Sequence, residues 1–183
     1  MATCIRDNVV CMRERVGVYP GSFNPPTHAH VEIALAARER HGLHRVDLAV
    51  SSVALGKERV QVPAFDQRIE VIRLSIAEID GLELVITSAQ LIADIATGYD
   101  VVVMGADKWT QVNDPSWYGD DPARRDAIVE QLPALALAPR PPHSIPDEHR
   151  LPVADDLLEV SSSAARAGRV EWMTHAARES GLW

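Results

Sequence analysis

Long hydrophobic runs and clusters of cysteine are both missing from this sequence of 183 residues. No apolar run near the start is long enough for a signal peptide, and none elsewhere could span a bilayer. The two cysteines, Cys4 and Cys11, are not spaced as C-x-x-C and are too few for a disulfide framework. We therefore expect a cytoplasmic protein with free thiols, a disulfide or an oligomer contact being the alternative for the cysteines.

Positive charge is scarce as well, because 18 Lys and Arg stand against 26 Asp and Glu, giving a net charge of −8. The overall field of such a chain does not attract nucleic-acid polymers, and no membrane is expected as a partner. A local basic pocket for a small phosphate is compatible with this charge. The length suits one globular core, so we predict an N-terminal extension over residues 1–14 and a single domain over residues 15–183.

Apolar segments alternate with segments of helical period along the chain. The segment Val101-Val102-Val103-Met104 is apolar at every position, which is typical of a central strand of a parallel sheet. These patterns predict an α/β fold, a Rossmann-like doubly wound parallel sheet of about five strands with helices on both faces and a small C-terminal helical part. The predicted strands are 16–19, 46–51, 82–86, 101–104 and 134–138. The predicted helices are 28–40, 65–79, 88–96 capped by Ser88, one without assigned bounds between the fourth and fifth strands, and one or two after residue 160.

Parallel sheets of this kind bind ligands at the carboxyl ends of their strands. Gly21, directly after the first strand, allows a ligand to approach the backbone closely, and the amides of Ser22 and Phe23 can point at phosphate oxygens. Thr27 can cap the following helix, and His30 in its first turn can donate to a phosphate. A plain surface turn with exposed histidines explains the same residues equally well, so residue chemistry alone leaves both interpretations open.

Two segments resemble signatures of the nucleotidyltransferase superfamily (cytidylyltransferase-like). Residues 21–30 resemble G-[ST]-F-[DN]-P-x-[HT]-x-G-H, with Ala29 in place of the last glycine. Residues 160–166 resemble I-S-S-T-x-I-R, although taken alone they would be interpreted as a serine helix cap followed by an exposed arginine. Two signatures in the right order, about 130 residues apart, rarely arise by accident.

The resemblance implies a role for each matching residue. His30, Thr27, Lys57 and Arg166 become candidates for catalysis. Asp107, in a G-x-D segment after the fourth strand, becomes a candidate to accept from the ribose hydroxyls. The residues implied in ATP binding are Gly21, Ser22, Phe23, His30, Gly105, Asp107, Ser161, Ser162, Ser163 and Arg166.

Within the superfamily, the chain is most similar to bacterial nicotinate-mononucleotide adenylyltransferases. This rests on residues 57–68, on Arg140-Pro141 after the fifth strand, and on the tail 176–183. The resemblance implies adenylyl transfer from ATP to a small phosphorylated acceptor, nicotinate mononucleotide first, giving the dinucleotide and pyrophosphate. Mg²⁺ would arrive with ATP, and no protein metal site is expected. The implied acceptor-binding residues are Lys57, Trp109, Trp117 and Arg140.

Alternatives remain open from the sequence. The Ser/Thr-Tyr-Thr stretch of that subfamily has no counterpart in residues 88–100, which admits phosphopantetheine or a sugar or alcohol phosphate as the acceptor. CTP could replace ATP. A nucleotide-binding protein without catalysis is a further alternative, which Ala29 and the missing stretch favour. The sequence decides neither whether the chain forms a homo-oligomer nor whether residues 139–152, which hold five of its twelve prolines, act as a lid.

Overall fold

A computed structural model describes residues 13–53 and 63–183 of the chain. All five strands pair in parallel in the order β3-β2-β1-β4-β5, which confirms the predicted α/β fold. The predicted fifth strand has the observed bounds, and the others differ by one residue at an end. The strands are β1 (Val16–Pro20), β2 (Arg45–Ser51), β3 (Leu82–Thr87), β4 (Val101–Gly105) and β5 (Ala134–Ala138).

Helices connect the strands, and most are shorter than the hydrophobic patterns predict. Two predictions were wrong in extent. The helix expected over 65–79 ends at Ile76, although Ile79 still packs on the core. Ser88 does not cap a helix, because the chain from Ser88 to Gln90 is irregular and only one helical turn follows Leu91. The helices are α1 (His28–His41), α2 (Phe65–Ile76), α3 (Ile92–Ile95), α4 (Ala106–Val112), α5 (Pro122–Glu130), α6 (Ser162–Arg166) and α7 (His175–Ser180).

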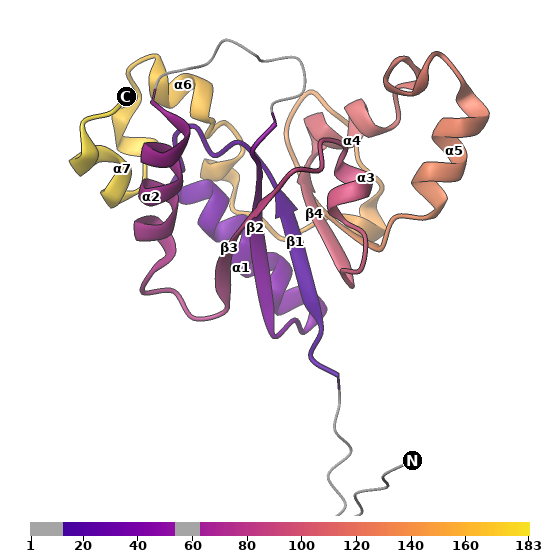
Figure 1. The fold of residues 1–183 in the computed structure, drawn as a ribbon, viewed down its shortest axis with the longest axis horizontal. Coiled ribbons are helices and arrows are strands. Elements are labelled where there is room, and N and C mark those ends of the chain that lie inside the picture. The colour runs from indigo at the N-terminus through magenta and orange to yellow at the C-terminus, as the bar shows by residue number, and fades with distance from the viewer. Residues whose placement is uncertain (1–12, 54–62) are drawn as a thin grey trace, which may run out of the picture.

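Short 3₁₀ segments fill the remaining connections. The predicted loop over residues 139–152 is irregular apart from the 3₁₀ segment Asp147–His149. Figure 1 shows α6 and α7 beside α2, whereas α5 lies at the opposite side of the molecule beyond α4. The 3₁₀ segments are η1 (Pro115–Tyr118), η2 (Asp147–His149), η3 (Asp155–Leu157) and η4 (Val170–Trp172).

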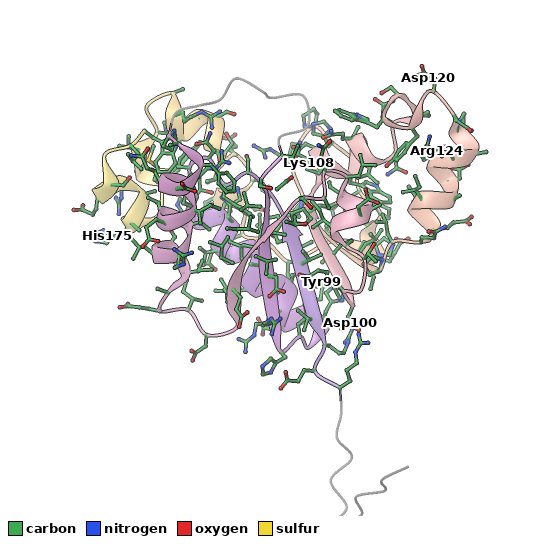
Figure 2. The ribbon with its side chains drawn as sticks, viewed as in Figure 1. Tyr99, Asp100, Lys108, Asp120, Arg124 and His175 are labelled. Carbon is green, nitrogen blue, oxygen red and sulfur yellow. The ribbon has the colours of Figure 1, made fainter. Side chains whose placement is uncertain are left out.

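The strands of one parallel sheet share their direction, so the sheet has an amino end and a carboxyl end. Tyr99 and Asp100, which precede β4, mark the amino end, and Lys108 in α4 lies toward the carboxyl end (Figure 2). The turn from β1 to α1, the start of α4 and the loop after β5 all leave the sheet at its carboxyl end. These connections carry His30, Asp107 and Arg140 of the predicted site residues.

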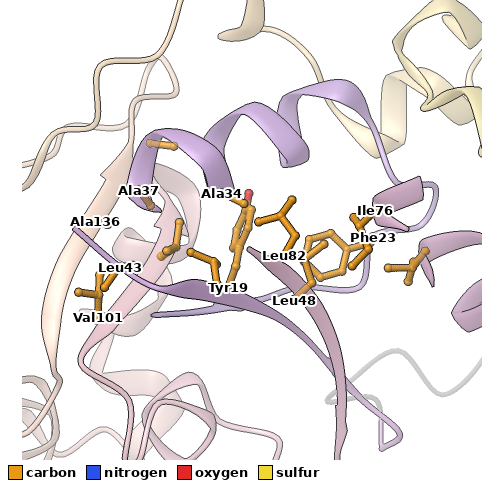
Figure 3. Close-up of a cluster of buried hydrophobic side chains, with 14 of the residues drawn as sticks. Tyr19, Phe23, Ala34, Ala37, Leu43, Leu48, Ile76, Leu82, Val101 and Ala136 are labelled. Carbon is orange, nitrogen blue, oxygen red and sulfur yellow. The ribbon is translucent and has the colours of Figure 1, made fainter. Parts of the chain in front are cut away.

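Alternate residues of the central strands pack on opposite faces of the sheet, as expected for strands covered on both sides. Val101 and Val103 belong to the cluster formed with α1 and α2, part of which Figure 3 shows, with Phe23 at one margin. Val102 and Met104 belong to a second cluster, formed with α3 and α4. A third, smaller cluster joins α2 to α6 and α7, so the segment after residue 160 is anchored to the main core.

Candidate functional site

The turn that leaves β1 is built around the ring of Phe23. This residue is buried, and its backbone has a φ of 42°, a conformation that non-glycine residues rarely adopt. A Cβ atom added to Gly21 would lie 2.8 Å from Cζ of the Phe23 ring. Glycine at this position therefore leaves room for the ring that anchors the turn.

The same turn holds three backbone amides without a hydrogen-bond partner in the described part of the chain: those of Ser22, Phe23 and Asn24. The amide of Gly21, by contrast, donates to the carbonyl of Ala49 at 3.0 Å. Since unsatisfied amides bind anions, the turn has the donors that a phosphate requires.

His30 is held by Thr27, the N-cap residue of α1. The backbone N–H of Thr27 donates to Nδ1 of His30 at 3.0 Å, and the hydroxyl oxygen of Thr27 lies 2.8 Å from the same nitrogen. A backbone N–H can only donate, so Nδ1 must be the acceptor. We therefore assign the proton of the neutral ring to Nε2, which becomes a hydrogen-bond donor.

The imidazole of His30 is neutral at pH 7. Burial, the nearby Arg140 guanidinium and His28 lower its pKa to about 4, against the opposing effect of Asp107. The ring stands edge-on to Phe23, with 5.0 Å between ring centroids. His30 therefore presents a fixed N–H donor rather than a titrating group.

Asp107 and Arg140 meet at the carboxyl ends of β4 and β5. An oxygen of the Asp107 carboxylate lies 3.7 Å from a guanidinium nitrogen of Arg140, and both side chains are about one third exposed. A Cβ atom on Gly105 would lie 2.7 Å from the same carboxylate oxygen, so glycine there makes room for the carboxylate. Arg140 also borders an open cavity of about 380 Å³ formed by residues 139–145 and Arg150.

The second signature contacts the first. Ser161 caps α6 by accepting from the amide of Ala164 at 3.2 Å, as its position in the sequence predicts. The hydroxyl of Ser162 donates to the carbonyl of Pro25 at 2.7 Å. Arg166 donates to the carbonyl of Asn24 and, at 3.3 Å, to the hydroxyl oxygen of Ser163. Segments 137 residues apart therefore form one surface.

Three further predicted site residues are Lys57, Trp109 and Trp117. Lys57, like Cys4 and Cys11, lies outside the described residues. Trp109 packs against the second core cluster, and Trp117 lies on η1 with 41% of its surface exposed. Within the described ranges, no hydrogen bond or ion pair links the side chain of either tryptophan to His30 or Arg140. Their role in acceptor binding stays a prediction.

The C-terminal residues that donate hydrogen bonds to the turn were not predicted from the sequence. The amide of Thr174 donates to the carbonyl of Pro26 at 3.1 Å, and the indole N–H of Trp183 donates to Oδ1 of Asn24. Asn24 is 4% exposed. The signal for Asn24 was its place in the signature, and Trp183 belongs to the matching tail, but no pattern in the sequence paired the two residues.

Two negative findings concern the described residues alone. Across residues 13–53 and 63–183, no three His, Cys, Asp or Glu side chains gather as a group that could hold a metal ion. No helix within the same ranges has the length and apolar composition needed to cross a membrane.

Comparison with protein families decides the classification. A family model described as cytidylyltransferase-like matches residues 18–168, which include both signatures and Asp107. The chain belongs to this family. As a member of the cytidylyltransferase-like family, it carries at the carboxyl end of its sheet the two segments that its sequence shares with the superfamily.

Curated relatives of this chain carry two different names. A "Phosphopantetheine adenylyltransferase" of Desulfosudis oleivorans is 32% identical over 70 residues, covering 38% of this chain and 39% of the relative. A "Probable nicotinate-nucleotide adenylyltransferase" of Gloeobacter violaceus is 33% identical over 79 residues, covering 43% and 38%. The chain thus spans about two fifths of the length of the curated relatives it matches.

Solved structures support the fold. The nicotinic acid mononucleotide adenylyltransferase of Plasmodium falciparum, complexed with NaAD, superposes with a TM-score of 0.63 at 13% identity. The alignment covers 92% of this chain and 94% of that chain. At this level of identity, the similarity establishes the shared architecture and nothing about the substrate.

Proposed function

We propose that this protein transfers the adenylyl group of Mg-ATP to a small phosphate-bearing acceptor and releases pyrophosphate, with nicotinate mononucleotide as the first candidate acceptor. One observation carries the proposal: the hydroxyl of Ser162 is bonded to the carbonyl of Pro25, two residues before Thr27, which holds His30. This contact puts the donors of both signatures around one turn.

The reaction is an in-line displacement. An oxygen of the acceptor's phosphate attacks the α-phosphorus of ATP, the bond from that phosphorus to the bridging oxygen breaks, and pyrophosphate leaves. The Nε2–H of His30 and the amides of Ser22 and Phe23 stabilise charge on the transferring phosphate. No side chain needs to act as a nucleophile, because positioning and electrostatic stabilisation suffice for phosphoryl-type transfer.

Pyrophosphate leaves toward the start of α6. Arg166 uses part of its guanidinium on Asn24 and Ser163, but guanidinium carries five N–H donors, so others stay available for phosphate oxygens. Ser163 accepts from Arg166, which leaves its own hydroxyl proton free to donate. Mg²⁺ accompanies ATP as part of the substrate, held by phosphates and water.

The acceptor lies on the side of Arg140 in this proposal. A guanidinium beside an open cavity suits an anionic group, while Asp107 suits the ribose hydroxyls of the nucleotide. Lys57, Trp109 and Trp117 stay candidates for acceptor binding, on the resemblance alone.

Phosphopantetheine is the second candidate acceptor, because a relative of that name matches this chain as well as the nicotinate-nucleotide relatives do. A protein that binds ATP without catalysis is the contrasting hypothesis. One of its two arguments, the methyl group of Ala29, is weakened because Ala29 is 3% exposed and protein atoms cover it.

A pyrophosphate-release screen tests the proposal. ATP and CTP are each offered with nicotinate mononucleotide, nicotinamide mononucleotide and phosphopantetheine, in the presence of Mg²⁺. We expect release with ATP and one of these acceptors, nicotinate mononucleotide giving the highest kcat/KM. Binding of ATP without pyrophosphate release for any acceptor would support the non-catalytic hypothesis instead.

A further inference from the structure

Three consecutive carbonyls of the first signature accept hydrogen bonds from one segment far along the chain. Arg166 donates to Asn24, the hydroxyl of Ser162 to Pro25, and the amide of Thr174 to Pro26. The peptide groups Asn24–Pro25 and Pro25–Pro26 have no N–H, because their nitrogens belong to prolines. Hydrogen bonds can orient them only through the carbonyls of Asn24 and Pro25. Ser162, Arg166 and Thr174 therefore determine how these peptide groups are oriented.

The peptide between Pro26 and Thr27 links this segment to His30. In a trans peptide the C=O and N–H point in opposite directions. The carbonyl of Pro26 accepts from the amide of Thr174 at 3.1 Å, and the N–H of Thr27 donates to Nδ1 of His30 at 3.0 Å. A displacement of this peptide toward or away from Thr174 would therefore change the orientation of the imidazole.

Trp183 supplies the fourth bond and ties the turn to the core. Its indole N–H donates to Oδ1 of Asn24, and its ring packs against the third core cluster, which includes Met173 and Ala177. Asn24 is almost fully buried, so this acceptor would lack a protein partner if the indole N–H were removed.

We propose that Trp183 is a positioning residue for the nucleotide site. By its hydrogen bond to Asn24 it holds the turn, so that Thr27 keeps the imidazole of His30 oriented toward the transferring phosphate. The catalytic part of this inference rests on the proposed adenylyl transfer. The structural part, that Trp183 holds the turn, can be tested without any substrate by the amide exchange of Thr27.

The test compares two tryptophan variants. Trp183→Phe keeps an aromatic ring and removes the N–H donor. Trp172→Phe is the matched control, because Trp172 packs on the same cluster, its ring lies 4.3 Å from the Arg169 guanidinium carbon, and its indole N–H makes no hydrogen bond to the turn within the described residues. Both variants are measured for thermal stability, for kcat and KM of pyrophosphate release, and for amide exchange of Thr27 by NMR.

We expect Trp183→Phe to lower kcat roughly three- to tenfold, as the loss of one net hydrogen bond would, with KM for ATP changed less than about twofold. The amide of Thr27 should exchange faster by a similar factor. Trp172→Phe should change neither kcat nor this exchange rate.

A purely structural role gives a different result. If Trp183→Phe lowers the melting temperature while kcat and the exchange of Thr27 stay at wild-type values, the proposal is overturned. If the wild-type protein releases no pyrophosphate with any acceptor, the proposed function fails, and the exchange rate of Thr27 alone then decides whether Trp183 holds the turn.

Discussion

The two ends of the sheet use similar groups in opposite ways. At the amino end, the carboxylate of Asp47 is 1% exposed and fully engaged, accepting from Arg45 at 2.8 Å and from the Tyr99 hydroxyl at 3.0 Å. At the carboxyl end, the amides of Ser22 and Phe23 have no partner among the described residues.

The carboxylate of Asp47 already has its hydrogen-bond donors and stabilises the fold. The amides of Ser22 and Phe23 can still bind a ligand. Asp100, also at the amino end, has its donors too. It accepts from the amide of Val16 and from Arg13, and these partners lower the pKa of its carboxyl group. Burial of a polar group therefore does not identify a functional site. What separates the ends of this sheet is whether the donors already have acceptors.

The largest effect should come from His30→Ala. If the Nε2–H stabilises the transferring phosphate, its loss should lower kcat about 100-fold or more. Because the buried amide of Thr27 also loses its acceptor, the variant should lose about 1–2 kcal/mol of stability. Steady-state pyrophosphate release checks this. His28→Ala, on the same turn of α1, is the control and should stay within about threefold of wild type. Near-normal turnover of His30→Ala would remove His30 from the mechanism.

Paired glycine substitutions along β1 compare the ends directly. Gly21→Ala must displace the Phe23 ring, which packs against His30, so we expect kcat to fall roughly tenfold. Gly17→Ala, at the amino end of the strand, meets the flexible side chain of Leu43 at 2.7 Å. It should cost about 1 kcal/mol of stability and leave kcat unchanged. Equal kcat values for the two variants would contradict the contrast.

Tyr99→Phe tests the amino end of the sheet. Burial, followed by the charge of Asp47, raises the pKa of the Tyr99 hydroxyl to about 12, so it remains a donor at pH 7. Its removal deprives a buried carboxylate of one partner and should cost about 1–2 kcal/mol in urea unfolding. The kcat of the folded enzyme should not change, and a large loss of activity at full stability would show that the amino end also serves catalysis.

The smallest effect concerns pH. The pKa of His30 is about 4 in the folded protein, against the ordinary histidine value of 6.5 in the unfolded chain, so the unfolded chain takes up the proton first as pH falls. The stability from neutral His30 is present above pH 6.5 and is lost as pH falls toward 4. Between pH 7 and pH 6 the loss should be about 0.7 kcal/mol. Urea unfolding of His30→Gln, compared with wild type, isolates this contribution, and identical pH dependence would contradict the low pKa.

Hydrophobic patterning predicted the strands well because the central ones include apolar runs buried on both faces, as in β1 and β4. It did not locate α5, whose start depends on capping by Asp121 and on Pro122 rather than on an apolar stripe. It overextended α2 because Ile79 continues the period and packs on the core although it lies in a turn.

The candidate site was predictable where a local motif carries it. The turn at residues 21–30 and the serine cap of α6 are contiguous in sequence, so their donors could be named in advance. The bond from Trp183 to Asn24 joins residues 159 apart. It depends on how α7 packs against α2, and no periodicity or spacing in the sequence specifies that geometry.

In the proposed mechanism, the phosphates of ATP bind the unpartnered amides after β1. Titration of ¹⁵N-labelled protein with Mg-ATP tests it directly, because each backbone amide reports separately. We predict the largest shifts at Ser22, Phe23 and Asn24, with Val16 and Asp100 unmoved at the other end of the sheet. If ATP binds and those three amides do not shift, the nucleotide lies elsewhere and the account is wrong.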